Sequence, residues 1–125
     1  MAKILRLKLR TILLVDERDG CRLTTKWFLG SFGFLVESAR SAEEALAVFD
    51  PRIHDLVITE NSMPGMSGVE MAHVIKLRSA TTPVLMCACQ LPDDTSCIDM
   101  VFERPVHLLK LKDAAEQLIA ERVPA

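Results

Sequence analysis

Short apolar runs alternate with amphipathic segments along the whole chain, and this alternation limits the fold more than any other sequence feature. Five runs are predicted to be strands because they are apolar and too short for helices; they cover residues 11–15, 34–38, 55–59, 83–88 and 101–103. Apolar side chains recur at helical spacing at residues 20–32, 42–49, 68–78 and 106–122. Strands that alternate with helices predict an α/β fold with a doubly wound, five-stranded parallel sheet covered on both faces.

The connection between the fourth and fifth strands is too short for a full helix. Only the twelve residues 89–100 separate them, whereas a parallel crossover needs about a dozen residues or more. Residues 90–94 have a turn-like composition, which leaves one or two helical turns around residues 95–100. We therefore predict that the fourth helix is short or missing.

The chain is predicted to form a single domain. Its 125 residues fit one hydrophobic core, and half of them are apolar. Residues 11–122 contain all the predicted elements, so no output domain is expected. Residues 1–10 form a basic arm, in which apolar and basic residues alternate strictly from Leu5 to Arg10. This pattern fits a half-exposed strand, which would lengthen the first strand or pair with a sheet edge, and a frayed basic tail equally well.

Composition argues against several classes of function. The formal net charge of −2 gives no bulk reason to expect nucleic-acid binding. No segment approaches the roughly 20 apolar residues of a membrane span, and charges interrupt every apolar run near the N-terminus, which lacks the apolar block of a secretion signal. We expect a cytoplasmic protein that binds neither nucleic acid nor membranes.

The cysteines and two other side chains are assigned structural roles at this stage. Cys21, Cys87, Cys89 and Cys97 form no Cys-x-x-Cys pair and no zinc pattern, so they are interpreted as small hydrophobic residues in a reducing compartment. Cys97 lies in a polar loop and is the candidate for a redox role. Trp27 is predicted to anchor the first helix in the core. His73 is predicted to be a packed or surface histidine.

The strongest functional signal is the segment DLVITENSMPGMSG at residues 55–68. It resembles the phosphorylation segment of receiver domains of two-component response regulators of the chemotaxis-regulator type. Met63, Pro64 and Gly65 match the active-site loop of that family. The phosphate-accepting aspartate of the family stands four residues before the proline, and this position is Glu60. The resemblance covers residues 11 to about 120 and implies a flavodoxin-like sheet with strand order 2-1-3-4-5.

The resemblance also implies a metal site. Asp16 and Glu17 follow the first strand, where receivers carry the acidic pair that holds Mg²⁺. The implied strand order brings them together with Glu60, and three neighbouring carboxylates repel one another and favour a bound cation. Glu17 and Glu60 are longer than the usual aspartates, and Mg²⁺ demands near-ideal octahedral geometry. Weak Mg²⁺ binding or its loss is therefore expected, and no other cofactor is implied.

Three further positions depart from the receiver pattern. Ala88 stands where receivers carry a Thr or Ser that donates to the phosphoryl group, and alanine has no donor. Val101 stands where receivers carry the aromatic side chain that moves on activation. Arg104, before Pro105, stands where receivers carry a lysine. Its planar guanidinium suits carboxylates, so we expect it to pair with Glu60 or Asp16.

Together these departures predict a pseudo-receiver. It would be a stand-alone signalling module that acts by protein–protein interaction, with little or no phosphotransfer and no enzymatic activity. Its partner would be a histidine kinase or a downstream effector, and Leu91, Val101 and residues 106–122 form the candidate interface. Homodimerisation through this face stays open, as does the choice between Glu60 as a mimic of the phosphorylated state and Glu60 as an inert replacement.

Two alternative functions follow from the same sequence. The first is a functional phosphoacceptor that uses Glu60 or a neighbouring group. The second is a flavodoxin-like enzyme, for which the sequence offers no glycine-rich dinucleotide motif, P-loop or Ser/His/Asp array. Fold alone does not grant an activity, so this second alternative is the more remote.

Overall fold

A computed structural model describes residues 1–2 and 9–123 of the chain. Residues 3–8 carry most of the basic arm, so the prediction of a strand extension or a frayed tail falls outside the described residues. None of the helices found among the described residues is long and apolar enough to cross a membrane.

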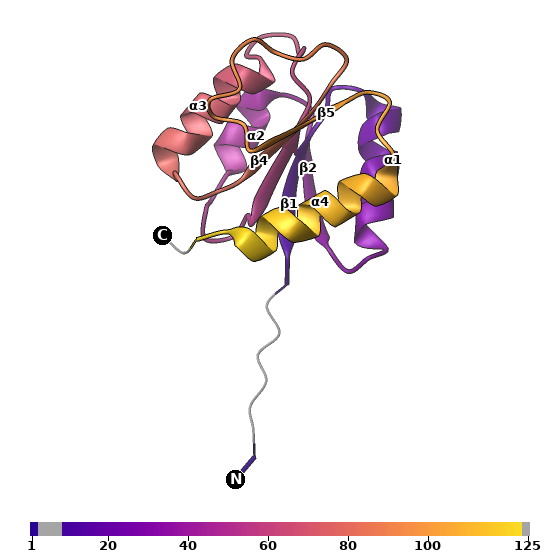
Figure 1. Cartoon of the computed structure of the whole chain (residues 1–125), viewed down its shortest axis with the longest axis vertical. Coiled ribbons are helices and arrows are strands. Elements are labelled where there is room, and N and C mark those ends of the chain that lie inside the picture. The colour runs from indigo at the N-terminus through magenta and orange to yellow at the C-terminus, as the bar shows by residue number, and fades with distance from the viewer. Residues whose placement is uncertain (3–8, 124–125) are drawn as a thin grey trace.

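The centre of the fold is a five-stranded sheet with the order β2-β1-β3-β4-β5 (Figure 1). All neighbouring strands pair in parallel. The strands are β1 (Thr11–Val15), β2 (Leu35–Ala39), β3 (Leu56–Thr59), β4 (Val84–Ala88) and β5 (Met100–Glu103). The predicted α/β class, the number of strands and the strand order are confirmed, and the strand bounds differ from the prediction by one residue at most.

Among the described residues, four helices cover the sheet, α1 and α4 on one face and α2 and α3 on the other (Figure 1). They are α1 (Asp19–Gly30), α2 (Ala42–Val48), α3 (Gly68–Arg78) and α4 (Leu108–Glu121). Leu29 of α1 and Leu111 of α4 pack on one face, in one hydrophobic cluster. Ala45 of α2 and Met71 of α3 belong to a second cluster on the other face. Strands β1, β3 and β4 are buried along their whole length, which explains their nearly continuous apolar sequences.

Side-chain caps begin the two helices on the second face. The hydroxyl of Ser41 accepts a hydrogen bond from the backbone N–H of Glu44 at 3.1 Å, at the start of α2. Ser67 and Glu70 form a complete capping box at the start of α3. Each cap satisfies backbone donors that the first turn of a helix leaves without partners. The capping box of α3 directly follows the loop that carries Met63, and it thereby fixes the end of this loop next to the candidate site.

The predicted loss of the fourth helix is confirmed, because residues 89–99 contain no helix. We call this segment the crossover. Its chain makes a turn in which the N–H of Ile98 donates to the carbonyl of Thr95 at 3.0 Å. Near its end, Oδ2 of Asp99 accepts from Nζ of Lys76 and from the backbone N–H of Val84, both at 2.7 Å. Side-chain contacts to α3 and β4 thus hold a segment that has too few residues for a helix.

The prediction that Trp27 anchors α1 in the core is wrong. Trp27 is 75% exposed, whereas Leu29 is fully buried. Residues two apart on a helix point about 200° apart, so burial of Leu29 turns Trp27 towards solvent. Arg22 also occupies the inward face, where its guanidinium donates to the backbone oxygen of Asp16 at 2.9 Å. The helical spacing placed Trp27 on one face of α1, but the face that packs in the core is the one that carries Leu29.

The exposure of Trp27 predicts a contrast between two substitutions in α1. Trp27→Ala should change the free energy of unfolding by no more than about 0.5 kcal/mol, because the indole leaves no cavity. Leu29→Ala should cost about 2–5 kcal/mol, because it empties a fully buried site. Urea denaturation of both variants measures the difference. A large loss for Trp27→Ala would contradict the observed orientation of the helix.

A close approach at Gly68 fixes the loop between β3 and α3. The N–H of Gly68 donates to the carbonyl of Asn61 at 2.9 Å, and a Cβ atom on Gly68 would lie 2.1 Å from the backbone oxygen of Glu60. Any side chain here would push α3 away from the end of β3. This glycine therefore holds the loop against the residue that follows the strand.

Gly68→Ala should reduce the free energy of unfolding by about 3 kcal/mol, because the backbone it would meet cannot rotate aside. Gly20→Ala is the matched control, since Gly20 also lies in the first turn of a helix and has no atom within 4 Å of the added Cβ. The control should be neutral or slightly stabilising because alanine favours helices. Equal effects in chemical denaturation would show that the close approach has no energetic consequence.

Candidate functional site

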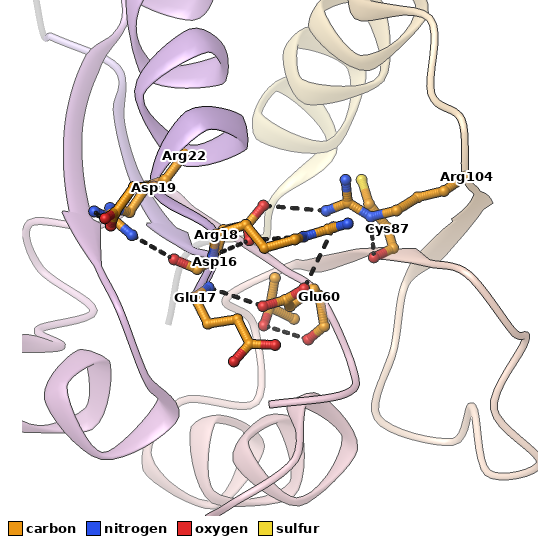
Figure 2. Close-up of polar contacts among 9 residues, drawn as sticks. Asp16, Glu17, Arg18, Asp19, Arg22, Glu60, Cys87 and Arg104 are labelled. Atoms are coloured by element: carbon orange, nitrogen blue, oxygen red, sulfur yellow. Dashed lines mark hydrogen bonds and ion pairs between the residues drawn. The ribbon is translucent and has the colours of Figure 1, made fainter. Parts of the chain in front are cut away.

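The candidate site lies at the carboxyl ends of the central strands (Figure 2). In β1 and β3, Val15 pairs with Thr59, so the residues that follow, Asp16 and Glu60, lie side by side. Both are buried, with exposed fractions of 4% and 6%. Open parallel sheets form binding sites at this edge because loops leave the strands in opposite directions there. The structure thus brings together two of the three carboxylates expected from the sequence.

Both carboxylate oxygens of Glu60 have partners. Oε1 accepts a hydrogen bond from the backbone N–H of Glu17 at 2.8 Å, and Oε2 lies 3.4 Å from Nη2 of Arg18. Burial raises the pKa of Glu60, and the nearby charges of Asp16 and Glu17 act in the same direction, whereas the Glu17 N–H and Arg18 oppose them. The position that accepts phosphate in receivers is therefore held inside the protein, and its charged form is disfavoured.

Arg18 is a site residue that the sequence analysis missed. Its Nε lies 3.6 Å from Oδ1 of Asp16 and its Nη2 reaches Glu60, so one guanidinium bridges the two carboxylates (Figure 2). The backbone N–H of Arg18 also donates to Oδ1 of Asp16 at 2.9 Å. An arginine directly after two acidic residues at a strand end was the available signal.

Arg104 directly follows the edge strand β5 and reaches the same site from that edge of the sheet. Its Nη2 donates to Oδ2 of Asp16 at 3.2 Å, and its Nε donates to the backbone oxygen of Cys87 at 3.3 Å. Asp16 is one of the two partners expected for Arg104, and Arg18 takes the other, Glu60. Two carboxylates and two guanidinium groups thus form a cluster whose formal charges cancel.

The donor set does not fit Mg²⁺. The four carboxylate oxygens of Asp16 and Glu60 face N–H groups or guanidinium nitrogens. The side chain of Glu17 is exposed and extends away from Arg18 (Figure 2). Among the described residues, no three His, Cys, Asp or Glu side chains gather in a way that could hold a metal ion. Mg²⁺ needs oxygen ligands in octahedral geometry, and here the buried carboxylate oxygens already contact nitrogen groups of the protein.

The remaining positions of the receiver pattern surround this cluster. Ala88 is buried at the end of β4, and its carbonyl accepts from the N–H of Arg104 at 2.8 Å, so only its backbone takes part. The hydroxyl of Thr59 does not replace the missing donor, because it donates to the backbone oxygen of Glu60 at 2.7 Å. Val101 is half-buried in β5, opposite Met86.

The loop expected to be retained adopts a defined conformation. Met63 is buried in the cluster shared by α2 and α3. Gly65 has a φ of +79°, a conformation that glycine adopts without strain. The next N–H, of Met66, donates to Oε1 of Glu43 at 2.7 Å, which lowers the pKa of Glu43. The loop is thus tied to α2, while Pro64 is exposed.

A cavity of about 760 Å³ opens beside the cluster, between α1 and the start of α4. Asp16, Arg18, Glu60 and Arg104 form its polar end. Its apolar walls include Leu14, Ile58, Val106, Leu108 and Leu111. Because the charged groups are paired with one another, this recess presents a neutral polar end and an apolar wall.

The opposite pKa shifts of Glu60 and Glu43 predict opposite pH effects for two glutamine variants. The pKa of Glu60 is higher in the folded protein than its value of 4.5 in the unfolded chain. Glu60 therefore stabilises the folded state fully below pH 4.5, and this stabilisation is lost as the pH rises through the folded pKa. Between about pH 4 and pH 7, Glu60→Gln should therefore gain stability relative to wild type. Glu43, whose pKa is lowered, stabilises above 4.5, so Glu43→Gln should lose stability over the same interval.

Urea midpoints of wild type and both variants at the two pH values give the required differences. Glu43→Gln is the matched control, since it makes the same chemical change at an exposed site. Shifts of the same sign in both variants would contradict this account of the site.

Comparison with known proteins places the chain in a family. Residues 12–116 match the response regulator receiver domain. A putative transcriptional regulator of Haloferax volcanii is 29% identical over 114 residues, which cover 88% of this chain and 19% of that protein. The chain therefore spans about a fifth of that relative, and the activity of the longer protein does not transfer to it.

Solved structures show the same fold. A CheY-like response regulator receiver domain protein from Methanospirillum hungatei has a TM-score of 0.85 and 23% identity, over 91% of this chain and 96% of that one. The response regulator TrrA of Thermotoga maritima, solved in complex with Mg²⁺-BeF, has a TM-score of 0.82 and 26% identity, over 88% of this chain and 99% of that one. With a parallel sheet of order 2-1-3-4-5, acidic residues after β1 and a Met-Pro-Gly loop after β3, the chain belongs to the response regulator receiver domain family of two-component systems.

Proposed function

We propose that the chain is a pseudo-receiver, which signals by binding another protein and has little or no phosphotransfer activity. The observation that carries this proposal is the pairing of Asp16 and Glu60 with the guanidinium groups of Arg18 and Arg104. The arginines neutralise the site within the chain itself, so no bound cation is needed to balance the buried carboxylates.

Phosphoryl transfer to Glu60 is disfavoured by position and by charge. Transfer depends on holding the acceptor oxygen in line with the phosphoryl group, with cations on its equatorial oxygens. Both oxygens of Glu60 already contact groups of the protein. Burial raises its pKa, which increases the fraction of the neutral carboxyl, a poor nucleophile. A donor would have to break two contacts before it met a reactive oxygen.

The path from the site to the surface also lacks its usual parts. Ala88 offers no hydroxyl to a group bound at Glu60. Val101 has no ring that could exchange between buried and exposed rotamers. The crossover occupies the place of the helix that stands between these two positions in the family. Signals in this chain would therefore not travel by the hydroxyl-to-aromatic route of active receivers.

The candidate partner surface is the face formed by the crossover, β5 and α4. Leu91 in the crossover is 58% exposed and Leu109 of α4 is 48% exposed. Val101 of β5 is half-buried. Receiver domains pair with histidine kinases and effectors, and we propose a partner of one of these two kinds. Binding to this face should not depend on a phosphodonor.

Incubation with a small phosphodonor and Mg²⁺ tests the proposal directly. Intact mass should show no stoichiometric adduct on wild type, and saturating Mg²⁺ should change its free energy of unfolding by less than about 0.5 kcal/mol. A stoichiometric adduct with the acid and base lability of an acyl phosphate would overturn the proposal, because it would make Glu60 or a neighbour a working acceptor.

A series of reversions separates the two arginines. The triple variant Glu60→Asp, Ala88→Thr and Arg104→Lys keeps Arg18, which pairs with Asp16 in the wild type, so Mg²⁺ should stabilise this variant only weakly. Adding Arg18→Ala should give a stabilisation of about 1 kcal/mol or more at saturating Mg²⁺. Arg52→Ala is the control for loss of an arginine, since Arg52 pairs with Asp50 on the surface. Equal Mg²⁺ responses with and without Arg18 would remove this residue from the explanation.

A further inference from the structure

The crossover passes α3 (Figure 1). A second group of reactive side chains lies there, outside every position of the receiver pattern. Sγ of Cys97 is 3.4 Å from Nδ1 of His73, and Nε2 of the same ring is 2.8 Å from Oδ2 of Asp94. A thiol, an imidazole and a carboxylate therefore lie in a row. Cys97 and Asp94 come from the crossover and His73 comes from α3.

The hydrogen bonds define which nitrogen of His73 carries the proton. Oδ1 of Asp94 accepts from the hydroxyl and the backbone N–H of Ser96 at 2.6 and 3.0 Å. These bonds and the one from His73 lower the pKa of Asp94 to about 2, so at neutral pH it is a carboxylate that only accepts. Nε2 must then be the donor, and in the neutral ring Nδ1 keeps its lone pair. Cys97 therefore donates its S–H to Nδ1.

This order of groups is that of a thiol activated by a neighbouring base. Nδ1 can take the proton of Cys97, and the carboxylate of Asp94 then stabilises the imidazolium. The thiolate, not the thiol, is the nucleophile, so a basic partner at hydrogen-bond distance raises reactivity. Small reagents can reach the group, because the side chains of His73 and Asp94 are about half exposed, at 47% and 50%, and Cys97 is half-buried.

We propose that Cys97 is a peroxide-reactive thiol, activated by His73, with Asp94 as the positioning residue of the ring. The thiolate sulfur attacks one oxygen of hydrogen peroxide, so that an S–O bond forms as the O–O bond breaks. The leaving hydroxide takes from His73 the proton that Cys97 gave up, and water is released. Cys97 is oxidised to a sulfenic acid and peroxide is reduced.

Oxidation at this place would act on the crossover. Cys97 and Ile98 pack against the hydrophobic cluster shared by α2 and α3. A sulfenic acid adds a polar oxygen beside that cluster and removes the S–H that His73 accepts. The crossover therefore has a chemical input of its own, in a domain whose carboxylate site is neutralised internally.

The test uses the full chain at neutral pH, with peroxide and the sulfenic-acid reagent dimedone, followed by peptide mapping. Wild type should carry the dimedone adduct on the peptide with Cys97.

Iodoacetamide, which alkylates sulfur with loss of iodide, measures the nucleophilicity of Cys97 in a separate experiment. In His73→Gln, alkylation of Cys97 should slow about tenfold, because glutamine keeps hydrogen bonds but is no base. Exposed Cys89 is the internal reference, and its rate should not change.

A second measurement needs no variant. Unfolding normally exposes a thiol and speeds its alkylation, whereas a thiol activated by the fold slows. In urea, with rates normalised to a free cysteine derivative, Cys97 of wild type should react about tenfold more slowly than in the folded protein. If His73 only pins the crossover, His73→Gln leaves the Cys97 rate equal or raises it, and unfolding accelerates alkylation. Either of these results overturns the proposal.

Discussion

Two buried carboxylates at the ends of adjacent parallel strands set the main electrostatic constraint of this fold. Asp16 and Glu60 are neighbours because the register of β1 and β3 pairs Val15 with Thr59, and both side chains are buried. Like charges at such a distance must be protonated, paired or bound to a cation. Here Arg18 and Arg104 provide the pairing, and they do so from the segments that follow β1 and β5.

An arginine and a metal ion balance the same charge with different consequences. A metal ion exchanges with solvent, so a site that needs one responds to its concentration and to ligands that share it. A guanidinium is covalently attached and always charged, so the positive charge that balances the carboxylates does not exchange with solvent. In the proposed pseudo-receiver, the family geometry is thus kept while the response of the site to a bound cation is lost. Retention of the Met63–Gly65 loop fits this view, because Met63 packs in the core and the next residue after the loop, Met66, donates to Glu43 of α2.

The sequence predicted the features that chain length and strand pattern determine. It did not predict those that depend on the orientation of a helix or the rotamer of a side chain. Strand order followed from the resemblance, and the missing helix followed from the length of residues 89–100, which no packing could change. Trp27 was misassigned because periodicity groups residues on one face of a helix but does not say which face packs on the sheet. In α1 the face that packs on the sheet is the one with Leu29 and the guanidinium of Arg22. Arg18 was missed because only its rotamer brings it to Glu60. His73 and Cys97 are 24 residues apart, and no spacing rule joins them.

The short crossover begins beside the carboxylate site, at Cys89 and Gln90, and continues to the group formed by Asp94, Cys97 and His73. A helix holds itself by backbone hydrogen bonds, whereas residues 89–99 are held chiefly through Asp94 and Asp99, which bind His73 and Lys76 of α3. Segments held by few, partly exposed polar contacts open at lower free energy than the core does. A change at one of those contacts therefore acts on the crossover before it acts on the sheet. If both proposals hold, the α3 side of the crossover, and not the carboxylate site at the strand ends, is the part of the domain that responds to a chemical signal.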